Sequence, residues 1–306
     1  MLTTRSIVAY PDLLLVIASA AVGLTFGRPL RWVGDHQGIN VLLAVLVLAT
    51  AVTVSTDALS RLSASWRQLA VTLGIGVLVL PAVSWLASRV VAAGSLRNGI
   101  MVVGIAPCEI ASVATTGLAG GDAALAAAVL IGSTVLSVAL AGPVLSLEAG
   151  HANVHPVHIL VNLAIVVALP LATGLALRAW VGITEHWESA ATWTATGALG
   201  GLVGLVAAQV HLGTAYMAVL VAIVIIVAAS AAIGLALGRT TSSERATSLL
   251  LTISMRDFAI AAGLAVTAFS PSAAAPLGLY GVVVIVWGTA VAGYLRARRA
   301  RSRSAR

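Results

Sequence analysis

Three ionisable side chains lie inside segments that are otherwise apolar. Glu109 follows the short run "APC", and Arg256 and Asp257 stand next to each other in a second segment far along the chain. A charged side chain at the centre of a bilayer costs about 3 kcal/mol or more, so such residues face a protein interior or a water-filled cavity. These three residues are therefore candidates for binding an ion or a polar ligand.

Both segments carry residues that interrupt a helix. Pro107 has no backbone N–H and clashes with the preceding turn, and Gly104 weakens the same stretch, so we expect the helix to unwind around residues 106–109. A second half-helix then starts near Glu109, where free N–H groups favour a carboxylate. In the other segment, Ser254 or Asp257 can cap a second half-helix in the same way.

The composition of the whole chain indicates a membrane protein. Of its 306 residues, 60% are apolar and 9% are charged, and the mean hydropathy is +1.06, so the chain lacks the polar surface of a soluble domain. The apolar runs are too many for a signal peptide. A phosphate-binding loop, a nucleophile–base arrangement and a multi-cysteine metal site are all absent from the sequence. We therefore expect neither an enzyme nor an ATP-driven pump, and no cofactor or metal.

The apolar segments predict an all-α polytopic fold. Ten segments are about as long as a bilayer-spanning helix requires. Ten divides into five plus five, which predicts one transmembrane domain over residues 1–295 with two inverted repeats, at about 10–147 and 156–295. Arg97 precedes Glu109 by twelve residues, and Arg245 precedes Asp257 by twelve, in the fourth segment of each half. The segments are 10–27, 39–56, 68–92, 98–119, 123–147, 156–179, 192–210, 213–237, 246–269 and 275–295.

The arginines predict an orientation. With both termini in the cytoplasm, the inner loops and the tail hold twelve arginines, Arg5 and Arg61 among them, and the outer loops hold four. Residues 296–306 form an Arg-rich cytoplasmic tail, for which we expect anionic lipid headgroups as partners rather than nucleic acid. The predicted location is a bacterial-type plasma or inner membrane.

Two stretches carry a resemblance to a known family. The proline of the fourth segment is followed by "ASVATTGLAGGDAAL", and the ninth segment contains "SMRDFAIAAGLA". With these the chain resembles the bile acid:sodium symporter family, within the bile/arsenite/riboflavin transporter superfamily. The resemblance implies that broken helices four and nine cross near the midplane. It also implies a core domain that rocks against a panel of helices one, two, six and seven. The matched positions are Ala111, Ser112, Thr116, Leu118, Ala119, Gly121 and Asp122.

The chain departs from this family at its sodium-site positions. Val113, Ala126 and Leu130 stand where the family has polar side chains, and Thr252 stands in place of a glutamate. Sodium coupling of the usual kind is therefore not expected. We hypothesise that Arg256 supplies the positive charge permanently, and that Glu109 and Asp257 neutralise it or carry a proton.

A second branch of the superfamily offers an alternative. "APC" and "DFAIA" resemble arsenite-efflux permeases, which use a cysteine in the first broken helix and a glutamate, one methylene longer than the aspartate of this chain, in the second. Cys108 and Asp257 occupy those positions, and soft thiol ligands suit arsenite.

The predicted function is secondary transport of a small or medium organic anion by alternating access, coupled to a proton or uncoupled rather than coupled to sodium. The predicted binding residues are Glu109, Ser112, Thr115, Thr252, Ser254, Arg256 and Asp257, with Asn162 or Gln209 on the panel side.

Overall fold

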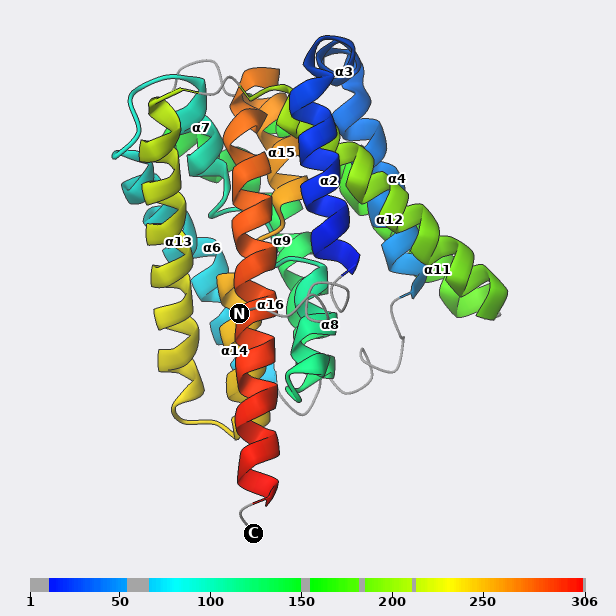
Figure 1. Cartoon of the computed structure of the whole chain (residues 1–306), viewed down its shortest axis with the longest axis vertical. Coiled ribbons are helices and arrows are strands. Elements are labelled where there is room, and N and C mark those ends of the chain that lie inside the picture. Colours follow the sequence, from blue (N-terminus) through cyan, green and yellow to red (C-terminus); the bar gives the residue numbers. More distant parts are fainter. Residues whose placement is uncertain (1–10, 54–65, 150–154, 182–184, 211–212, 305–306) are drawn as a thin grey trace.

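The computed structural model describes residues 11–53, 66–149, 155–181, 185–210 and 213–304. In these residues the chain is helical almost throughout, and no strand longer than a single bridge is formed (Figure 1). The elements are α2 (Pro11–Thr25), α3 (Gly27–Val33), the π-helix η1 (Gly34–Gly38), α4 (Ile39–Thr53), α6 (Trp66–Ser88), α7 (Ser95–Val102), α8 (Ala111–Leu118), α9 (Ala123–Glu148), α10 (Pro156–Leu163), the π-helix η3 (Ala164–Ala168), α11 (Leu169–Val181), α12 (Glu185–Ala208), α13 (Ala215–Gly238), α14 (Ser243–Ser254), α15 (Phe258–Ala268), the 3₁₀ helix η4 (Pro271–Ala274) and α16 (Ala275–Ser304).

Long apolar helices confirm the prediction of a polytopic membrane protein. Seven helical stretches in the described part of the chain are long and apolar enough to cross a membrane. The fourth and ninth predicted segments each fall on two short helices instead, α7 with α8 and α14 with α15. One boundary differs clearly, because α16 continues to Ser304 through the Arg-rich tail. Alanine and arginine are both strong helix formers, so the helix extends beyond its apolar part.

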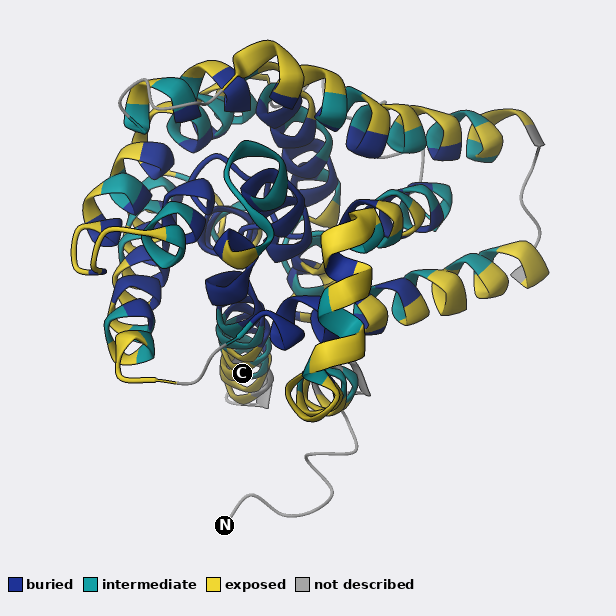
Figure 2. Cartoon of the chain, turned by 90° about the horizontal axis from the view of Figure 1, so that it is seen from above, coloured by how far each residue is buried: buried dark blue, intermediate teal, exposed yellow. Residues whose placement is uncertain are grey.

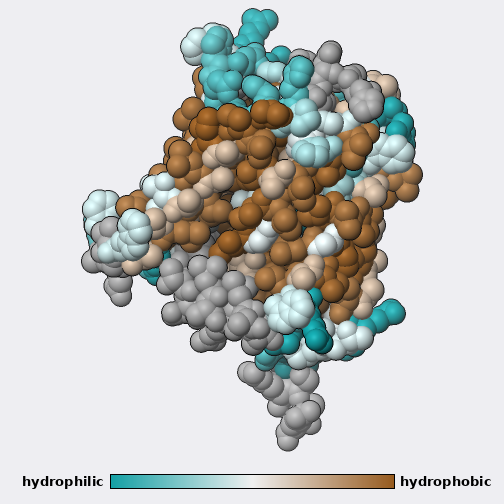
Figure 3. Space-filling model, turned by 180° about the vertical axis from the view of Figure 1, so that it is seen from behind, coloured by the Kyte–Doolittle hydropathy of each residue, from teal (hydrophilic) through white to brown (hydrophobic). Residues whose placement is uncertain are grey.

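The surface carries the polarity that a bilayer requires. Figure 3 shows one face on which apolar residues form a broad middle zone, with hydrophilic residues at the two ends. Large apolar side chains such as Leu78 and Val135 are more than half exposed. Seen from above, the buried residues gather in the middle of the helix cluster (Figure 2). Exposed apolar side chains around a buried interior fit helices that face lipid.

The helices pack in two groups. In the first, which we call the α12 group, α12 lies along α2 and α4, and α4 lies along α11. In the second, the α16 group, α13 packs on α14, α6 packs on α9 and α7, and α16 contacts α7, α8, α13 and α15. Figure 1 shows the lower ends of α4, α11 and α12 leaning away from α8 and α16. The α12 group corresponds to the first, second, sixth and seventh predicted segments.

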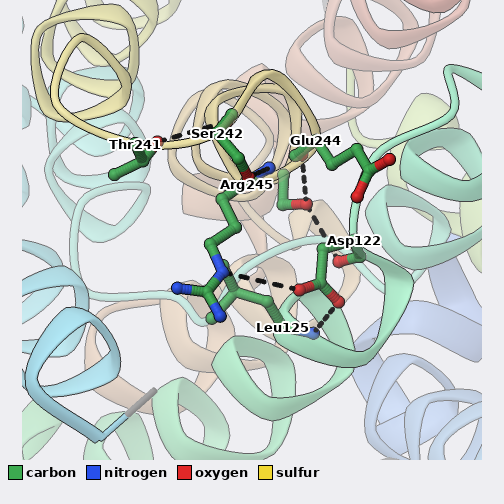
Figure 4. Close-up of polar contacts among 7 residues, drawn as sticks. Asp122, Leu125, Thr241, Ser242, Glu244 and Arg245 are labelled. Atoms are coloured by element: carbon green, nitrogen blue, oxygen red, sulfur yellow. Dashed lines mark hydrogen bonds and ion pairs between the residues drawn. The ribbon is translucent and has the colours of Figure 1, made fainter. Parts of the chain in front are cut away.

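Two turns at the end of the molecule near the C-terminus are joined to each other (Figure 4). Asp122 caps α9 by accepting a hydrogen bond from Leu125 N at 3.0 Å. The backbone N–H of Asp122 donates to the Glu244 carbonyl at 3.2 Å, and Ser248 Oγ donates to the Asp122 carbonyl at 2.9 Å. Arg245 Nε lies 3.9 Å from Asp122 Oδ2. The α8–α9 turn and the start of α14 are therefore joined by hydrogen bonds and an ion pair.

Arg299 on α16 holds both turns from the side. Its guanidinium donates to the Gly120 carbonyl, and Nη2 donates to Ser243 Oγ and Thr247 Oγ1, both at 3.3 Å. Gly120 has a φ of 72°, where a residue with a Cβ is strained, and a Cβ there would also collide with this guanidinium.

We predict that Arg299→Ala lowers the free energy of unfolding by about 1–2 kcal/mol, because charged hydrogen bonds across three elements are lost. Denaturation of the purified protein, followed by circular dichroism, measures the change. Arg298→Ala is the matched control, because Arg298 is the exposed neighbour on the same helix. Equal stability of the two variants would contradict this role for Arg299.

Candidate functional site

The site begins at two interruptions in the α16 group. The first runs from Val103 to Ile110 between α7 and α8, and contains Gly104 and Pro107. The second is the short segment 255–257 between α14 and α15. Pro107 cannot donate a helical hydrogen bond, so the chain cannot continue as a helix through the first segment.

The two interruptions pair with each other. Glu109 N donates to the Met255 carbonyl at 2.8 Å, and Asp257 N donates to the Pro107 carbonyl at 2.9 Å. Between these bonds Cys108 and Arg256 lie opposite each other in an isolated antiparallel bridge. Backbone groups freed by each broken helix are thus satisfied by the other one, as a low-dielectric interior requires.

The side chain of Arg256 contacts the first interruption. Its Nη2 donates to the carbonyls of Ala106 and, at 3.3 Å, of Gly104, which follow the C-terminal end of α7. A positive charge is favourable there because the helix dipole places partial negative charge at that end. Its backbone N donates to the Tyr280 hydroxyl at 3.1 Å. The residue is 4% exposed, so this charge is held inside the protein.

The expected pairing of Arg256 with the two carboxylates is not formed. No ion pair joins Arg256 to Glu109 or Asp257 among the described residues, whose ion pairs lie elsewhere. The carboxylates face α15 instead: Asp257 Oδ1 accepts from Ile260 N at 2.8 Å, and Glu109 Oε2 accepts from Phe258 N at 3.3 Å. The free N–H groups of a helix start compete well for carboxylates, which explains the difference.

A cavity of about 510 Å³ opens beside the bridge, between the two helix groups. Its walls come from α4 and α12 on one side and from α8 and α16 on the other, with Glu109 and Met255 at the crossing. Its volume is in the range of small-molecule sites. The lining residues are Leu46, Thr50, Thr53, Glu109, Ile110, Ala111, Ala114, Thr115, Leu118, Thr192, Ala195, Thr196, Leu199, Met255, Ile285, Thr289, Ala292, Gly293 and Arg296.

Two of the predicted binding residues line this cavity, Glu109 and Thr115. Five others are buried and do not line it, namely Ser112, Thr252, Ser254, Arg256 and Asp257. Thr252 and Arg256 line a separate small void with Thr72 and Ser133.

The two residues predicted on the panel side lie elsewhere. Asn162 Nδ2 donates to Thr267 Oγ1 at 2.7 Å, so it links the α10–α11 segment to α15. Gln209 is buried just beyond the end of α12. Neither lines the cavity. Gln209 follows the end of α12 that is opposite the lining Thr192 and Thr196, and Asn162 lies on α10, which contributes no residue to the lining.

Sequence reasoning missed several lining residues. Thr50 and Thr53 on α4, and Thr192 and Thr196 on α12, place hydroxyl groups on the cavity wall. Their spacing of three and four residues puts each pair on one helix face, which was a usable signal. Arg296 on α16 was assigned to the tail, yet it lies at the cavity because α16 continues unbroken.

Cys108 is fully buried in the bridge. Its exposed fraction is 0%, its backbone N donates to Ser133 Oγ at 3.1 Å, and it is not part of the cavity lining. Within the described ranges, no group of three or more histidine, cysteine, aspartate or glutamate residues is close enough to hold a metal ion.

Gly104 gives a direct test of how the first interruption is packed. A Cβ at this position would lie 2.2 Å from Ser84 Oγ and 2.4 Å from the Leu80 carbonyl, so Gly104→Ala forces α6 away from the bridge. We predict a loss of about 2 kcal/mol or more of unfolding free energy, measured by thermal denaturation in detergent. Gly74→Ala on α6 is the control, because a Cβ there meets nothing within 4 Å. A Gly104→Ala protein as stable as the control would show that the close approach is not needed.

The chain was compared with known proteins. The model of the sodium bile acid symporter family matches residues 40–218, which is more than half of the chain and includes the first interruption. No curated protein matches the chain. The family and the apolar helices together describe a membrane transporter of the bile acid symporter type. The chain therefore belongs to the sodium bile acid symporter family.

Proposed function

We propose that this protein is a secondary transporter that moves a small or medium organic anion across a bacterial-type cell membrane by alternating access. The observation that carries the proposal is the cavity of about 510 Å³ between the α12 group and the α16 group, which reaches the crossing of the two broken helices. Irregular backbone at membrane depth is tolerated where it lines such a cavity, and it often marks a transport site.

An anionic substrate is supported by charge. Arg296 is exposed at the cavity and supplies a cation where a substrate enters. The first residues of α8 also lie on the cavity wall, and the start of a helix adds partial positive charge.

Alternating access is supported by how the groups are arranged. The two groups meet across a cavity, so one can rock against the other and move its opening. The antiparallel bridge between the interruptions fits two inverted repeats, at about 10–147 and 156–295, in one transmembrane domain. With both termini in the cytoplasm, the cavity beside Arg296 would open inward. Arg5 and Arg61, which contribute to that orientation, lie outside the described residues.

The coupling ion is the second part of the proposal. The guanidinium of Arg256 contacts two carbonyls of the interruption, which are oxygens of the kind that a sodium ion binds. Ala126 and Leu130 add only apolar groups and are buried. We therefore propose that transport is independent of sodium, and is either uncoupled or coupled to a proton on a carboxylate.

No observation favours the arsenite alternative, because Cys108 lies behind the cavity wall rather than on it.

Blocking the cavity tests the site. We predict that Ala114→Trp abolishes anion uptake into proteoliposomes, because the indole fills space next to Glu109 and Thr115. Ala82→Trp is the control, because Ala82 is exposed on α6 and does not line the cavity. Uptake by the Ala114→Trp protein at the control rate would place the pathway elsewhere.

Replacing the external cation tests the coupling. We predict that uptake of the same anion by wild-type proteoliposomes changes by less than about twofold when sodium is replaced by N-methylglucamine, because Arg256 already supplies the charge. Strict dependence on sodium would reject this part of the proposal and leave transport itself intact.

A further inference from the structure

A second cavity, of about 350 Å³, lies between the start of α6 and the turn that joins α13 to α14. Arg299 of α16 donates to Ser243, the first residue of α14, so this cavity lies at the end of the molecule that carries the Arg-rich tail. Two of its wall residues, Thr72 and Leu249, are buried, so it reaches into the protein. It shares no lining residue with the cavity of the proposed transport pathway. The lining residues are Arg67, Gln68, Val71, Thr72, Leu237, Thr240, Thr241 and Leu249.

The walls of this second cavity change in polarity along the membrane-spanning helices. On α6, Arg67 belongs to the first turn, and Val71, which is 52% exposed, follows one turn further in on the same side of the helix. On the other wall, Leu237 lies in the last turn of α13, and Thr240 and Thr241 come after the end of that helix. The cavity is therefore polar where two membrane-spanning helices end and apolar where they enter the bilayer.

The polar end of the cavity offers hydrogen-bond donors. Arg67 forms no ion pair within the described residues, and its guanidinium lies over the ring of Trp66 at 5.5 Å. Trp66 is 61% exposed, as in an aromatic belt at a membrane surface. Gln68 Nε2 is buried and has no hydrogen-bond partner in the described part of the chain. A buried donor of this kind is stabilised by a ligand that brings an acceptor, and a guanidinium suits the oxygens of a phosphate group.

We propose that this cavity binds the phosphate group of an anionic phospholipid. Arg67 and Gln68 donate to the phosphate oxygens, and the first part of an acyl chain lies against Val71 and Leu237. Basic pockets between membrane-spanning helices bind anionic headgroups in this way. A phosphate ion from solution would use the same donors but would leave the apolar part of the cavity uncovered, so the lipid is the better match. The site is separate from the tail, whose arginines do not line this cavity.

Native mass spectrometry of the wild-type protein in a maltoside detergent tests the site. The probes are phosphatidylglycerol and phosphatidylcholine with the same palmitoyl and oleoyl chains, each added over a range of concentrations. We expect the first phosphatidylglycerol to bind about fivefold or more tightly than the first phosphatidylcholine, because the guanidinium of Arg67 favours a headgroup with net negative charge. A third arm adds inorganic phosphate at the concentration of the lipid, and it should leave the bound phosphatidylglycerol in place.

Two variants and a matched control assign the preference to the cavity. In Arg67→Gln the preference for phosphatidylglycerol should fall to within about twofold, because the charge is lost. Gln68→Leu should weaken phosphatidylglycerol binding by about threefold, because a donor is lost at similar volume. Arg89→Gln is the control and should keep the wild-type preference. Arg89 directly follows the other end of α6, lies over Trp85 at 4.1 Å and does not line the cavity.

Each remaining outcome overturns a stated part of the proposal. Equal affinity of wild-type protein for the two lipids overturns the preference for an anionic headgroup. A preference that persists in Arg67→Gln, or that is lost equally in Arg89→Gln, places the lipid outside this cavity. Displacement of phosphatidylglycerol by inorganic phosphate assigns the donors to phosphate from solution instead of a lipid. The wild-type comparison holds even where a variant fails to fold, and none of these results depends on the proposed transport.

Discussion

The structure depends on one short contact, in which each of two broken helices supplies hydrogen-bond partners for free backbone groups of the other. Two breaks in an apolar interior would leave several peptide groups without partners, at a cost of about 1–3 kcal/mol for each unsatisfied group. The bonds from Glu109 N to Met255 O and from Asp257 N to Pro107 O remove part of that cost. Neither break is tolerable without the other, so the crossing fixes how α7, α8, α14 and α15 are placed.

The charged groups follow from the same contact. Once the backbones pair, the remaining free N–H and carbonyl groups at the ends of the half-helices still need partners. A carboxylate suits the N–H groups and a cation suits the carbonyls. Arg256 serves the carbonyls beyond α7, and Asp257 and Glu109 serve the first N–H groups of α15. Only Glu109 also faces the cavity. Arg256 and Asp257 are thus buried at the crossing and do not line the cavity, whereas Glu109 lies both at the crossing and on the cavity wall.

How much of this was predictable differs between fold and site. The apolar runs, Pro107 and the charges at 109 and 256–257 indicated a helical membrane protein with two interrupted segments, since hydropathy and proline act locally. The partners of Arg256 were not predictable, because the choice between a carboxylate and a carbonyl depends on how two distant segments cross. Asn162 and Gln209 were expected to line the panel side of the cavity because of the helices on which they lie. The sequence does not show which part of a helix borders a cavity. The threonines at 50, 53, 192 and 196 were overlooked because a threonine in an apolar helix carries no charge to mark it.

One consequence concerns α16, which touches the crossing, the cavity and the joined turns along a single unbroken helix. Trp287 Nε1 donates to Ser254 Oγ at 2.9 Å, Arg296 lines the cavity, and Arg299 holds the turns. An α-helix turns by about 100° per residue, so the number of residues between these contacts sets the direction in which each side chain points. Inserting or deleting one residue between Trp287 and Arg296 would turn both arginines away from their partners. During evolution this stretch can therefore accept substitutions more readily than insertions or deletions.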